Sequence, residues 1–237
     1  YAPGRIDGIK TAIKIAREND MAVIGGVRGP FSAGWLLTGF SEMLIMFYDD
    51  REIVDEVLTK VTDFFIRGGE MMAEAGVDAL QFADDYGSNT SPFCSPDQFR
   101  EIILPHTRRL IQTLKKTGLP VMMHSDGHIM PLLHDIVEAG ISSCHPIERS
   151  AGMDLATIKS LYGKKICLVG NVNNKTTLVT GTTADVEEEV KECIIAAATG
   201  GGYILASDHS VHDDVPNENV LAMYEAGRKY GKYPISI

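Results

Sequence analysis

Short apolar runs alternate along this chain with longer segments in which apolar positions recur every three or four residues. The longer pattern, first seen at Ile9–Asn19, is typical of an amphipathic helix. The short runs lack the alternation of a one-sided strand, which indicates strands buried on both faces. We predict six of them: Met21–Val27, Asp78–Ala83, Val121–His124, Ile141–His145, Lys165–Asn171 and Tyr203–Ala206.

A helical pattern separates each of these strands from the next. The helical segments are 34–75 with a break near Tyr48–Asp50, 96–117, Ile129–Ala139, Asp154–Tyr162, 183–198 and Asn217–Tyr230. Asp49 or Asp50 is a suitable N-cap for the second helix of the first segment, Gly76 a C-cap, and Pro96 a first helical residue. Strands joined through helices pair in parallel with right-handed crossovers. We therefore predict one α/β domain over residues 1–237.

Six strands fit two architectures. A (β/α)8 barrel needs eight strands, so either two are missing at the N-terminal side or the sheet is open. The chain has no GxGxxG sequence, which makes a dinucleotide-binding sheet less favoured. Because the chain begins with Tyr1 rather than Met, we expect a fragment or a processed chain.

Polar residues follow the C-terminal end of each strand, where parallel α/β folds bind their ligands. They are Arg28, Phe31 and Ser32, then Asp84, Asp85 and Tyr86, then His124, Asp126 and His128, then His145 and Glu148, then Asn171 and Asn173, and last Asp208, His209 and His212. Each has a structural alternative: Asp84 or Asp85 as a helix cap, His124 as a rim histidine, Asn171 as a partner of backbone groups. Together they predict one shared pocket.

Two chemistries suit this residue set. His124, Asp126 and His209, joined by Asp84 or Glu148, offer nitrogen and oxygen ligands of the kind that bind zinc. No short motif such as HExxH supports the metal. Without a metal, His and Asp still provide proton transfer near neutral pH.

Composition excludes several classes of protein. The net charge of -10, from 32 acidic and 22 basic residues, argues against nucleic acid as a partner. No apolar run approaches the roughly 18 residues of a membrane span, and no signal-peptide pattern is present. The 4 cysteines contain no CxxC pair and are expected as free thiols in a cytoplasmic protein, with Cys144, Cys167 and Cys193 in the core.

An ordered set of short sequences extends over nearly the whole chain. The set comprises Asp84–Gly87, Ser95-Pro96, His124–Gly127, Val169–Val172, Gly202–His209, Asp214–Asn219 and Tyr230-Gly231. In this order the sequences resemble the uroporphyrinogen decarboxylase (URO-D) family, and its corrinoid-dependent methyltransferase branch in particular. The resemblance implies a distorted (β/α)8 TIM barrel of which this chain is the C-terminal two-thirds. The family's N-terminal arginines and first-strand aspartate have no counterpart here.

The branches of that family differ in their ligands. True decarboxylases act on a tetracarboxylate porphyrinogen without metal or cofactor, and Trp35 or Leu36 stands where they carry a tyrosine. Thiol-methylating members bind zinc through His-x-Cys and a late Cys. Here His124 matches, Asp126 replaces the first Cys, and Asp208 or His209 lies near the second. The remaining resemblance is to enzymes that move a methyl group from a small methylated or methoxylated substrate to a corrinoid protein.

These arguments lead to specific roles. We expect catalytic roles for His124, His209, Asp84 and Asp85, substrate binding by Arg28, Phe31, Tyr86, Glu148, Asn171 and Asp208, and zinc binding by His124, Asp126 and His209. The corrinoid would be carried by a partner protein, and the chain itself could form a homodimer. The alternatives are a cofactor-free uroporphyrinogen decarboxylase and a non-catalytic barrel that binds a corrinoid protein or a small ligand.

Overall fold

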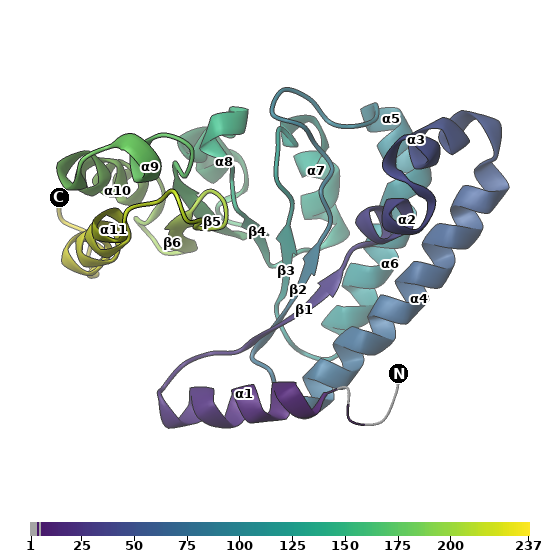
Figure 1. Ribbon diagram of the computed structural model, residues 1–237, viewed down its shortest axis with the longest axis horizontal. Coiled ribbons are helices and arrows are strands. Elements are labelled where there is room, and N and C mark those ends of the chain that lie inside the picture. Colours follow the sequence, from purple (N-terminus) through teal and green to yellow (C-terminus); the bar gives the residue numbers. More distant parts are fainter. Residues whose placement is uncertain (1–3, 5) are drawn as a thin grey trace. The chain divides into compact units, whose positions relative to one another are not determined.

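A computed structural model of the protein describes Gly4 and residues 6–237. Its strands are β1 (Ile24–Arg28), β2 (Ala79–Ala83), β3 (Val121–His124), β4 (Ser143–His145), β5 (Cys167–Val172) and β6 (Tyr203–Ser207). Helices follow each strand before the next begins (Figure 1). All six predicted strands are therefore present, in the predicted α/β order.

The helices also follow the sequence pattern, with two differences. They are α1 (Asp7–Glu18), α2 (Pro30–Thr38), α3 (Phe40–Asp49), α4 (Arg51–Ala75), α5 (Pro96–Gln98), η1 (Phe99–Ile103), α6 (Leu104–Lys115), α7 (Met130–Ala139), η2 (Arg149–Ala151), α8 (Leu155–Tyr162), α9 (Thr177–Thr180), α10 (Thr183–Ala197) and α11 (Asn217–Tyr230). The first helical segment starts earlier than predicted and has a second break, because Gly39 adopts a φ of +98° between α2 and α3. The short helices η2 and α9 lie outside the helical segments that the sequence predicts.

The chain divides into two compact units. Unit 1 comprises Tyr1–Tyr86, Pro92–His124 and Pro131–Ser142, and unit 2 comprises Gly87–Ser91, Ser125–Met130 and Ser143–Ile237. The single domain over residues 1–237 remains a prediction. Among the described residues, no helix combines the length and apolar character that a membrane crossing requires.

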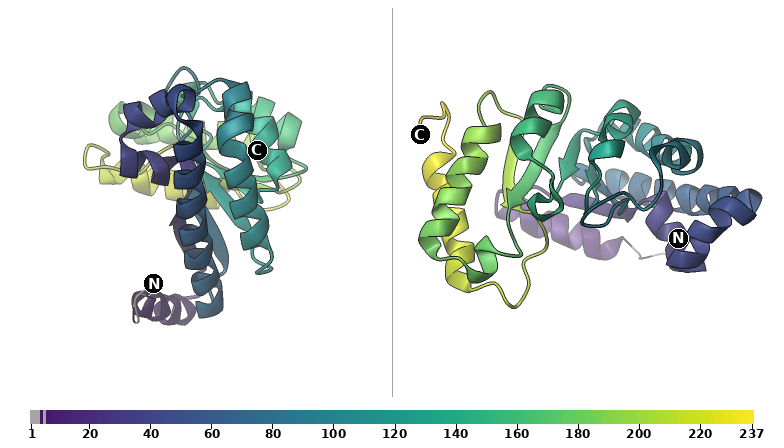
Figure 2. Two further views of the ribbon diagram at one scale, coloured as in Figure 1. Left: turned by 90° about the vertical axis from the view of Figure 1, so that its right-hand side faces the viewer. Right: turned by 90° about the horizontal axis from the view of Figure 1, so that it is seen from above.

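Unit 1 is built on the parallel strands β1, β2 and β3, paired in that order. Helix α4 packs against β1 and β2, α6 packs against β3, and the two helices run side by side (Figures 1 and 2). The buried side chains of Leu80, Phe82, Val121 and Met123 form the strand side of this core. Burial on this scale is the main stabilising contribution to such a unit.

Local signals in the sequence place the helix ends of unit 1. The Asp50 carboxylate accepts a hydrogen bond of 3.2 Å from the Ile53 backbone N–H and so caps α4, as predicted. Gly76 ends α4 in the left-handed conformation. Ser95 and Gln98 form a reciprocal capping box around Pro96 at the start of α5. The predicted caps at Asp50 and Gly76 and the predicted helix start at Pro96 are confirmed.

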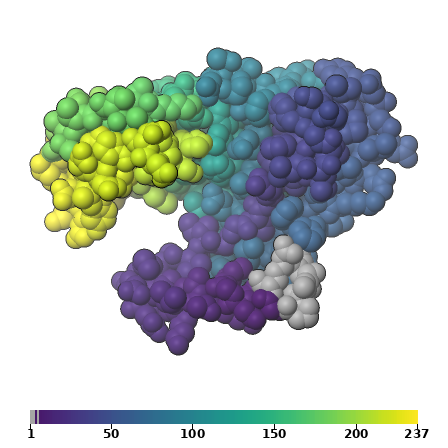
Figure 3. Space-filling model, viewed as in Figure 1, coloured from purple at the N-terminus to yellow at the C-terminus, as the bar shows by residue number. Residues whose placement is uncertain are grey.

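Unit 2 is built on β4, β5 and β6, again parallel and in sequence order. Helix α10 packs against α8, β5 and α11, and α10 and α11 lie along each other at the surface (Figures 2 and 3). Gly170 has a φ of +128°, and a Cβ there would lie 1.6 Å from the Pro146 carbonyl oxygen. Glycine at this position therefore lets the chain after β4 approach β5 closely.

The predicted core cysteines fall largely inside the units. Cys144 and Cys193 are buried and Cys167 is half-buried, and all are free thiols. Burial raises the pKa of the Cys144 thiol to about 12 and that of Cys193 to about 11. Thiols in this state are poor nucleophiles, so they act as small packing residues.

Candidate functional site

In unit 1, two of the predicted residues meet at the ends of β2 and β3. Ala83 pairs with His124 in the parallel register, which places Asp85 just beyond the same end of the strands. The Asp85 Oδ1 atom lies 3.8 Å from Nε2 of His124. Both side chains are partly exposed, at 42% and 23%. A solvent-accessible carboxylate and imidazole are therefore adjacent at this strand end.

Asp84 has different surroundings from its neighbour Asp85. Its carboxylate is completely buried and accepts hydrogen bonds from the backbone N–H groups of Phe31 at 3.2 Å and Ser32 at 2.5 Å. The Tyr86 hydroxyl donates a third bond of 2.7 Å. Burial raises the pKa of Asp84 to about 7, although these hydrogen bonds act in the opposite direction. Its contacts are those of a cap on the first turn of α2, and its catalytic role stays a prediction.

The predicted substrate-binding aromatics of unit 1 are packed inside it. The rings of Phe31 and Tyr86 are stacked with centroids 6.4 Å apart, and Phe99 meets Tyr86 edge-on at 5.1 Å. The Tyr86 hydroxyl also lies 3.0 Å from Oγ1 of Thr107, and burial raises its pKa well above the ordinary value. These contacts hold the β2 end against the helices. A role in substrate binding stays a prediction for both residues.

Arg28, the last residue of β1, lies beside an apolar groove instead. This groove, with a volume of about 490 Å³, is lined mainly by hydrophobic side chains. The lining comprises Arg28, Ala33, Leu36, Leu37, Lys60, Val61, Phe64 and Phe65. The guanidinium is thus exposed next to apolar surface, and its predicted role in substrate binding is untested.

In unit 2, Asp126 and His209 come together from different strand ends. The Asp126 Oδ2 atom lies 3.4 Å from Nε2 of His209, although the residues are far apart in sequence. Their side chains are 25% and 46% exposed. The Ser207 hydroxyl donates a 2.6 Å hydrogen bond to the His209 carbonyl and so fixes the turn that follows β6. This is a second accessible carboxylate–imidazole pair.

Glu148 occupies the interior of unit 2 rather than a solvent-facing position. Its Oε1 accepts from Lys175 Nζ at 2.6 Å and from the Ser150 hydroxyl at 2.7 Å, while Oε2 accepts from the Gly127 backbone N–H at 2.7 Å. Burial acts to raise the pKa of Glu148, but these donors outweigh it and hold the pKa below the ordinary value. A buried glutamate that stays charged here binds the surrounding loops together.

Asp208 and Asn171 also make structural contacts. Burial raises the pKa of Asp208, opposed first by the Asn174 backbone N–H, which donates a 2.7 Å bond. The Asn171 amide donates to the carbonyls of Ile147 at 2.5 Å and Met153 at 3.2 Å. Ile147 has a φ of +51°, so this amide holds a strained turn. The alternative interpretation of Asn171, as a partner of backbone groups, describes these contacts; its role toward a substrate is untested.

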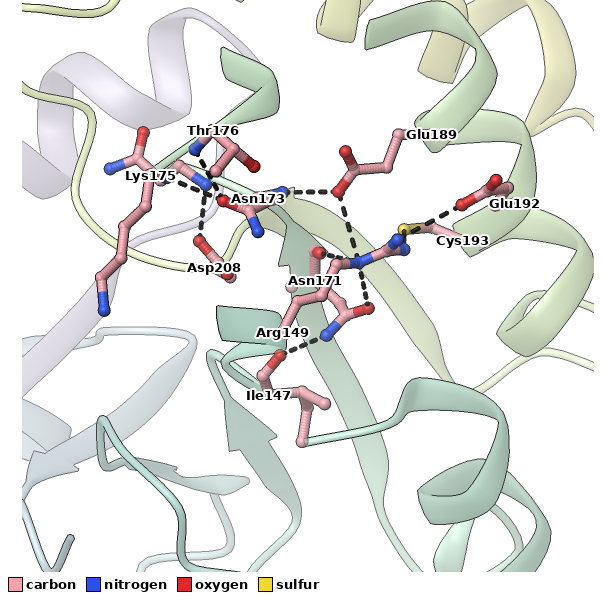
Figure 4. Close-up of polar contacts among 12 residues, drawn as sticks. Ile147, Arg149, Asn171, Asn173, Lys175, Thr176, Glu189, Glu192, Cys193 and Asp208 are labelled. Atoms are coloured by element: carbon pink, nitrogen blue, oxygen red, sulfur yellow. Dashed lines mark hydrogen bonds and ion pairs between the residues drawn. The ribbon is translucent and has the colours of Figure 1, made fainter. Parts of the chain in front are cut away.

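Two basic residues in this region were missed by the sequence argument. Arg149 is surrounded by Asn171, Glu189, Glu192 and Cys193 (Figure 4), with ion pairs of 3.3 Å to Glu189 and 3.2 Å to Glu192. Lys175 binds Glu148. The partners are separated by 43 residues for Arg149–Glu192 and by 27 for Lys175–Glu148. Neither pair has a sequence signal, because the partners are far apart in the chain and outside any shared periodic pattern.

The donor set fits a zinc ion. Imidazole nitrogen and carboxylate oxygen are both ordinary zinc ligands. The separation of 3.4 Å between Asp126 Oδ2 and His209 Nε2 matches the roughly 3.3 Å expected for two ligands of tetrahedral zinc with bonds of about 2.0–2.1 Å. Asp85 and His124 offer the same atom types at 3.8 Å.

The fold and these strand ends define a TIM-barrel-type α/β protein with ionisable residues at the C-terminal ends of its strands. The uroporphyrinogen decarboxylase (URO-D) family profile matches residues 1–230, and the chain belongs to this family. The resemblance to this family that the sequence shows is thereby confirmed. The fold is that of the family, represented here by six strand–helix units.

The chain matches relatives with two different activities at similar sequence identity. The chain is 27% identical over 229 residues to the methylcobamide:CoM methyltransferase MtaA of Methanosarcina barkeri, covering 95% of this chain and 64% of the relative. It is 25% identical over 228 residues to uroporphyrinogen decarboxylase 2, chloroplastic, of Oryza sativa subsp. japonica, covering 92% and 56%. It is 27% identical over 227 residues to uroporphyrinogen decarboxylase of Thermus thermophilus, covering 92% and 62%. The named relatives are all enzymes.

A solved structure supports the same placement. The methyltransferase from Methanosarcina mazei has a TM-score of 0.82 to this chain at 26% identity, over 97% of this chain and 66% of that protein. Protein SMc04130 from Sinorhizobium meliloti 1021, at a TM-score of 0.52 and 17% identity, shares the fold alone. The chain spans 64% of the length of the M. barkeri relative.

Proposed function

We propose that this chain belongs to a methyltransferase that moves a methyl group from a small methylated or methoxylated substrate to a corrinoid carried by a partner protein. The observation that carries the proposal is the Asp126–His209 pair, with 3.4 Å between carboxylate oxygen and imidazole nitrogen. It offers a zinc site made of nitrogen and oxygen ligands without cysteine. The methyltransferases of M. barkeri and M. mazei among its relatives support methyl transfer as the reaction class.

His124 is the third zinc ligand that the sequence predicts. It is separated from Asp126 by one residue, so covalent geometry limits the distance between their Cα atoms to about 7 Å. Asp85, partly exposed and 3.8 Å from the His124 imidazole, is the carboxylate that can orient this ring. Zinc held there would act as a Lewis acid toward the methyl-bearing oxygen or nitrogen and make it a better leaving group.

Uroporphyrinogen decarboxylase is the second candidate function, because the decarboxylase of Thermus thermophilus is 27% identical to this chain. Trp35 and Leu36 stand where the resemblance to true decarboxylases calls for a tyrosine. The two functions differ in metal requirement and in substrate. A metal measurement on the full chain therefore separates them.

The first prediction is that the protein binds about one zinc per chain and that Asp126→Ala and His209→Ala each weaken the binding. Loss of a ligand should cost more than the roughly 10–100-fold in affinity that an outer-shell change costs. Affinity is measured by competition with a chromophoric chelator, and metal content by elemental analysis. His134→Ala is the matched control, because His134 is an exposed histidine on α7.

Activity assays complete the test. Methyl transfer to cob(I)alamin should fall with metal content in Asp126→Ala, His209→Ala and His124→Ala. A wild-type protein with no affinity for zinc that releases carbon dioxide from uroporphyrinogen would reject the methyltransferase in favour of the decarboxylase. Unchanged methyl transfer and metal content in His124→Ala would remove His124 from the ligand set.

A further inference from the structure

Glu148 connects three chain segments through one buried carboxylate. Only 3% of its surface is exposed. One oxygen accepts from Ser150 and Lys175, and the other accepts from the backbone of Gly127. These donors come from the segments that follow β4, β5 and β3. A buried carboxylate is tolerated only with this level of compensation, which makes the contacts specific.

Lys175 supplies the charge that compensates Glu148 and adds a fourth segment. Its ammonium nitrogen lies 2.6 Å from Glu148 Oε1 and 3.2 Å from Oδ1 of Asn89. Asn89 belongs to Gly87–Ser91, the part of unit 2 that follows Asp85 and Tyr86 in the chain. One ion pair therefore joins four segments of unit 2.

The segment that carries Asp126 is held directly by this pair. Gly127, which accounts for one of the Glu148 bonds, is the residue after Asp126. It has a φ of +86°, and a Cβ there would lie 2.3 Å from the Gly87 carbonyl oxygen. The backbone N–H of the next residue, His128, donates a 2.7 Å bond to the Ser88 carbonyl. The backbone of Gly127, next to Asp126, is thus hydrogen-bonded to Glu148 and packed closely against the Gly87 carbonyl.

The segment that carries His209 is held through the neighbour of Lys175. The Asn174 backbone N–H donates to Asp208 at 2.7 Å, and the Asn174 amide donates to the Ser210 carbonyl at 2.6 Å. These two bonds hold Asp208 and Ser210, the residues immediately before and after His209. Asn174, the residue before Lys175, therefore holds the His209 backbone through both of its neighbours.

We propose that the Glu148–Lys175 ion pair is a positioning device that sets the distance between Asp126 and His209. The backbone next to Asp126 is bonded to the carboxylate of the pair, and the residues on either side of His209 are bonded to Asn174, the residue that precedes the lysine of the pair. The inference deepens the proposed function and rests on it, because the positioned atoms are those assigned to the zinc site. Glu148 and Lys175 act through the backbone and are not ligands themselves.

The second prediction tests this pair with Lys175→Met, Glu148→Gln and the conservative Lys175→Arg in the full chain. Lys175→Met and Glu148→Gln should each weaken zinc binding by about tenfold, and Lys175→Arg should retain most of the affinity. The visible absorption of the Co²⁺-substituted protein should change in shape and intensity with the first two variants, since it reports the ligand geometry. Lys60→Met is the matched control, because Lys60 forms an exposed i,i+4 pair with Glu56 on α4.

The outcomes separate this inference from the proposed function. A lower Tm with unchanged zinc affinity and Co²⁺ spectrum in both Lys175→Met and Glu148→Gln would overturn positioning and leave the methyltransferase proposal standing. A wild-type protein that binds neither zinc nor Co²⁺ would overturn both. Weaker binding and an altered spectrum in the two variants, with Lys175→Arg and Lys60→Met close to wild type, would support the inference.

Discussion

Asp84 and Asp85 are adjacent acids in opposite environments. Asp84 is completely buried at the start of α2, whereas Asp85 is partly exposed beside His124. Successive side chains of an extended segment point in opposite directions, so only one of the two can face the interior. The buried carboxyl caps a helix, and the exposed one lies beside the His124 imidazole.

The third prediction concerns the pH dependence of stability through Asp84. Burial raises its pKa from an ordinary 3.8 to about 7. Its contribution to stability is therefore fully present below pH 3.8 and is lost as the pH rises through 7. The shift corresponds to an upper bound of about 4 kcal/mol. The Asp84→Asn side chain stays neutral, so the free energy of unfolding of this variant should lack the pH-dependent contribution of Asp84.

The measurement is the difference in urea-unfolding free energy between wild type and Asp84→Asn at pH 5 and at pH 8. Asn should become more favourable relative to Asp at the higher pH. Asp213→Asn, in the exposed loop before α11, serves as the control substitution. A difference between Asp84→Asn and wild type that is the same at both pH values would mean that Asp84 titrates normally.

At the scale of the element, helix starts are determined by a few side chains. Thr182 and Asp185 form a capping box at α10, in which the Thr182 hydroxyl accepts from the Asp185 backbone N–H at 3.3 Å. The Asp185 carboxylate accepts from the Thr182 backbone N–H at 2.8 Å. Thr182 is the residue immediately before the helical segment 183–198 that the sequence predicts. Helix α10 packs on α8, β5 and α11, so this cap begins a helix that contacts several elements of unit 2.

The fourth prediction is that Thr182→Ala lowers the free energy of unfolding by about 1 kcal/mol, because it leaves a first-turn N–H without its acceptor. Urea denaturation monitored by circular dichroism provides the value. Thr199→Ala, at an exposed turn position, is the control and should change the stability by no more than about 0.5 kcal/mol. Equal effects of the two substitutions would show that the box contributes nothing to α10.

At the scale of the whole molecule, charge determines which partners the protein can attract. The sequence carries 32 acidic and 22 basic residues, for a net charge of -10. Many basic side chains are also paired with acids, as in Arg149 with Glu189 and Glu192. A negatively charged surface repels polyanions and favours cationic or neutral partners.

The fifth prediction follows from that charge. At pH 7.5 and about 50 mM salt, the protein should flow through a heparin column and bind an anion exchanger, since binding to polyanions requires clustered basic residues. A basic protein of similar size provides the positive control for the heparin column. Retention on heparin that salt abolishes would reveal a local basic surface that the net charge conceals.

The sequence by itself determined the elements of this protein and their order. The uninterrupted apolar runs at Val121–His124 and Lys165–Asn171 predicted buried parallel strands, because a sheet covered on both faces removes the usual alternation. Asp49 or Asp50, Gly76 and Pro96 predicted helix ends, because the signals that start and stop a helix are local. Polar residues after each strand located the candidate chemistry, because the carboxyl ends of paired parallel strands lie at one edge.

Only the tertiary structure decided what each of those polar residues touches. Both the apposition of Asp126 to His209 and the Glu148–Lys175 pair join segments that are distant in sequence. The burial of Asp84, Tyr86 and Glu148, rather than their exposure in a pocket, likewise depends on which helices and loops pack over the strand ends. Local patterns record the period of an element, whereas these contacts arise only when separate elements pack together. That is the physical reason why the strands could be predicted and the partners of their terminal residues could not.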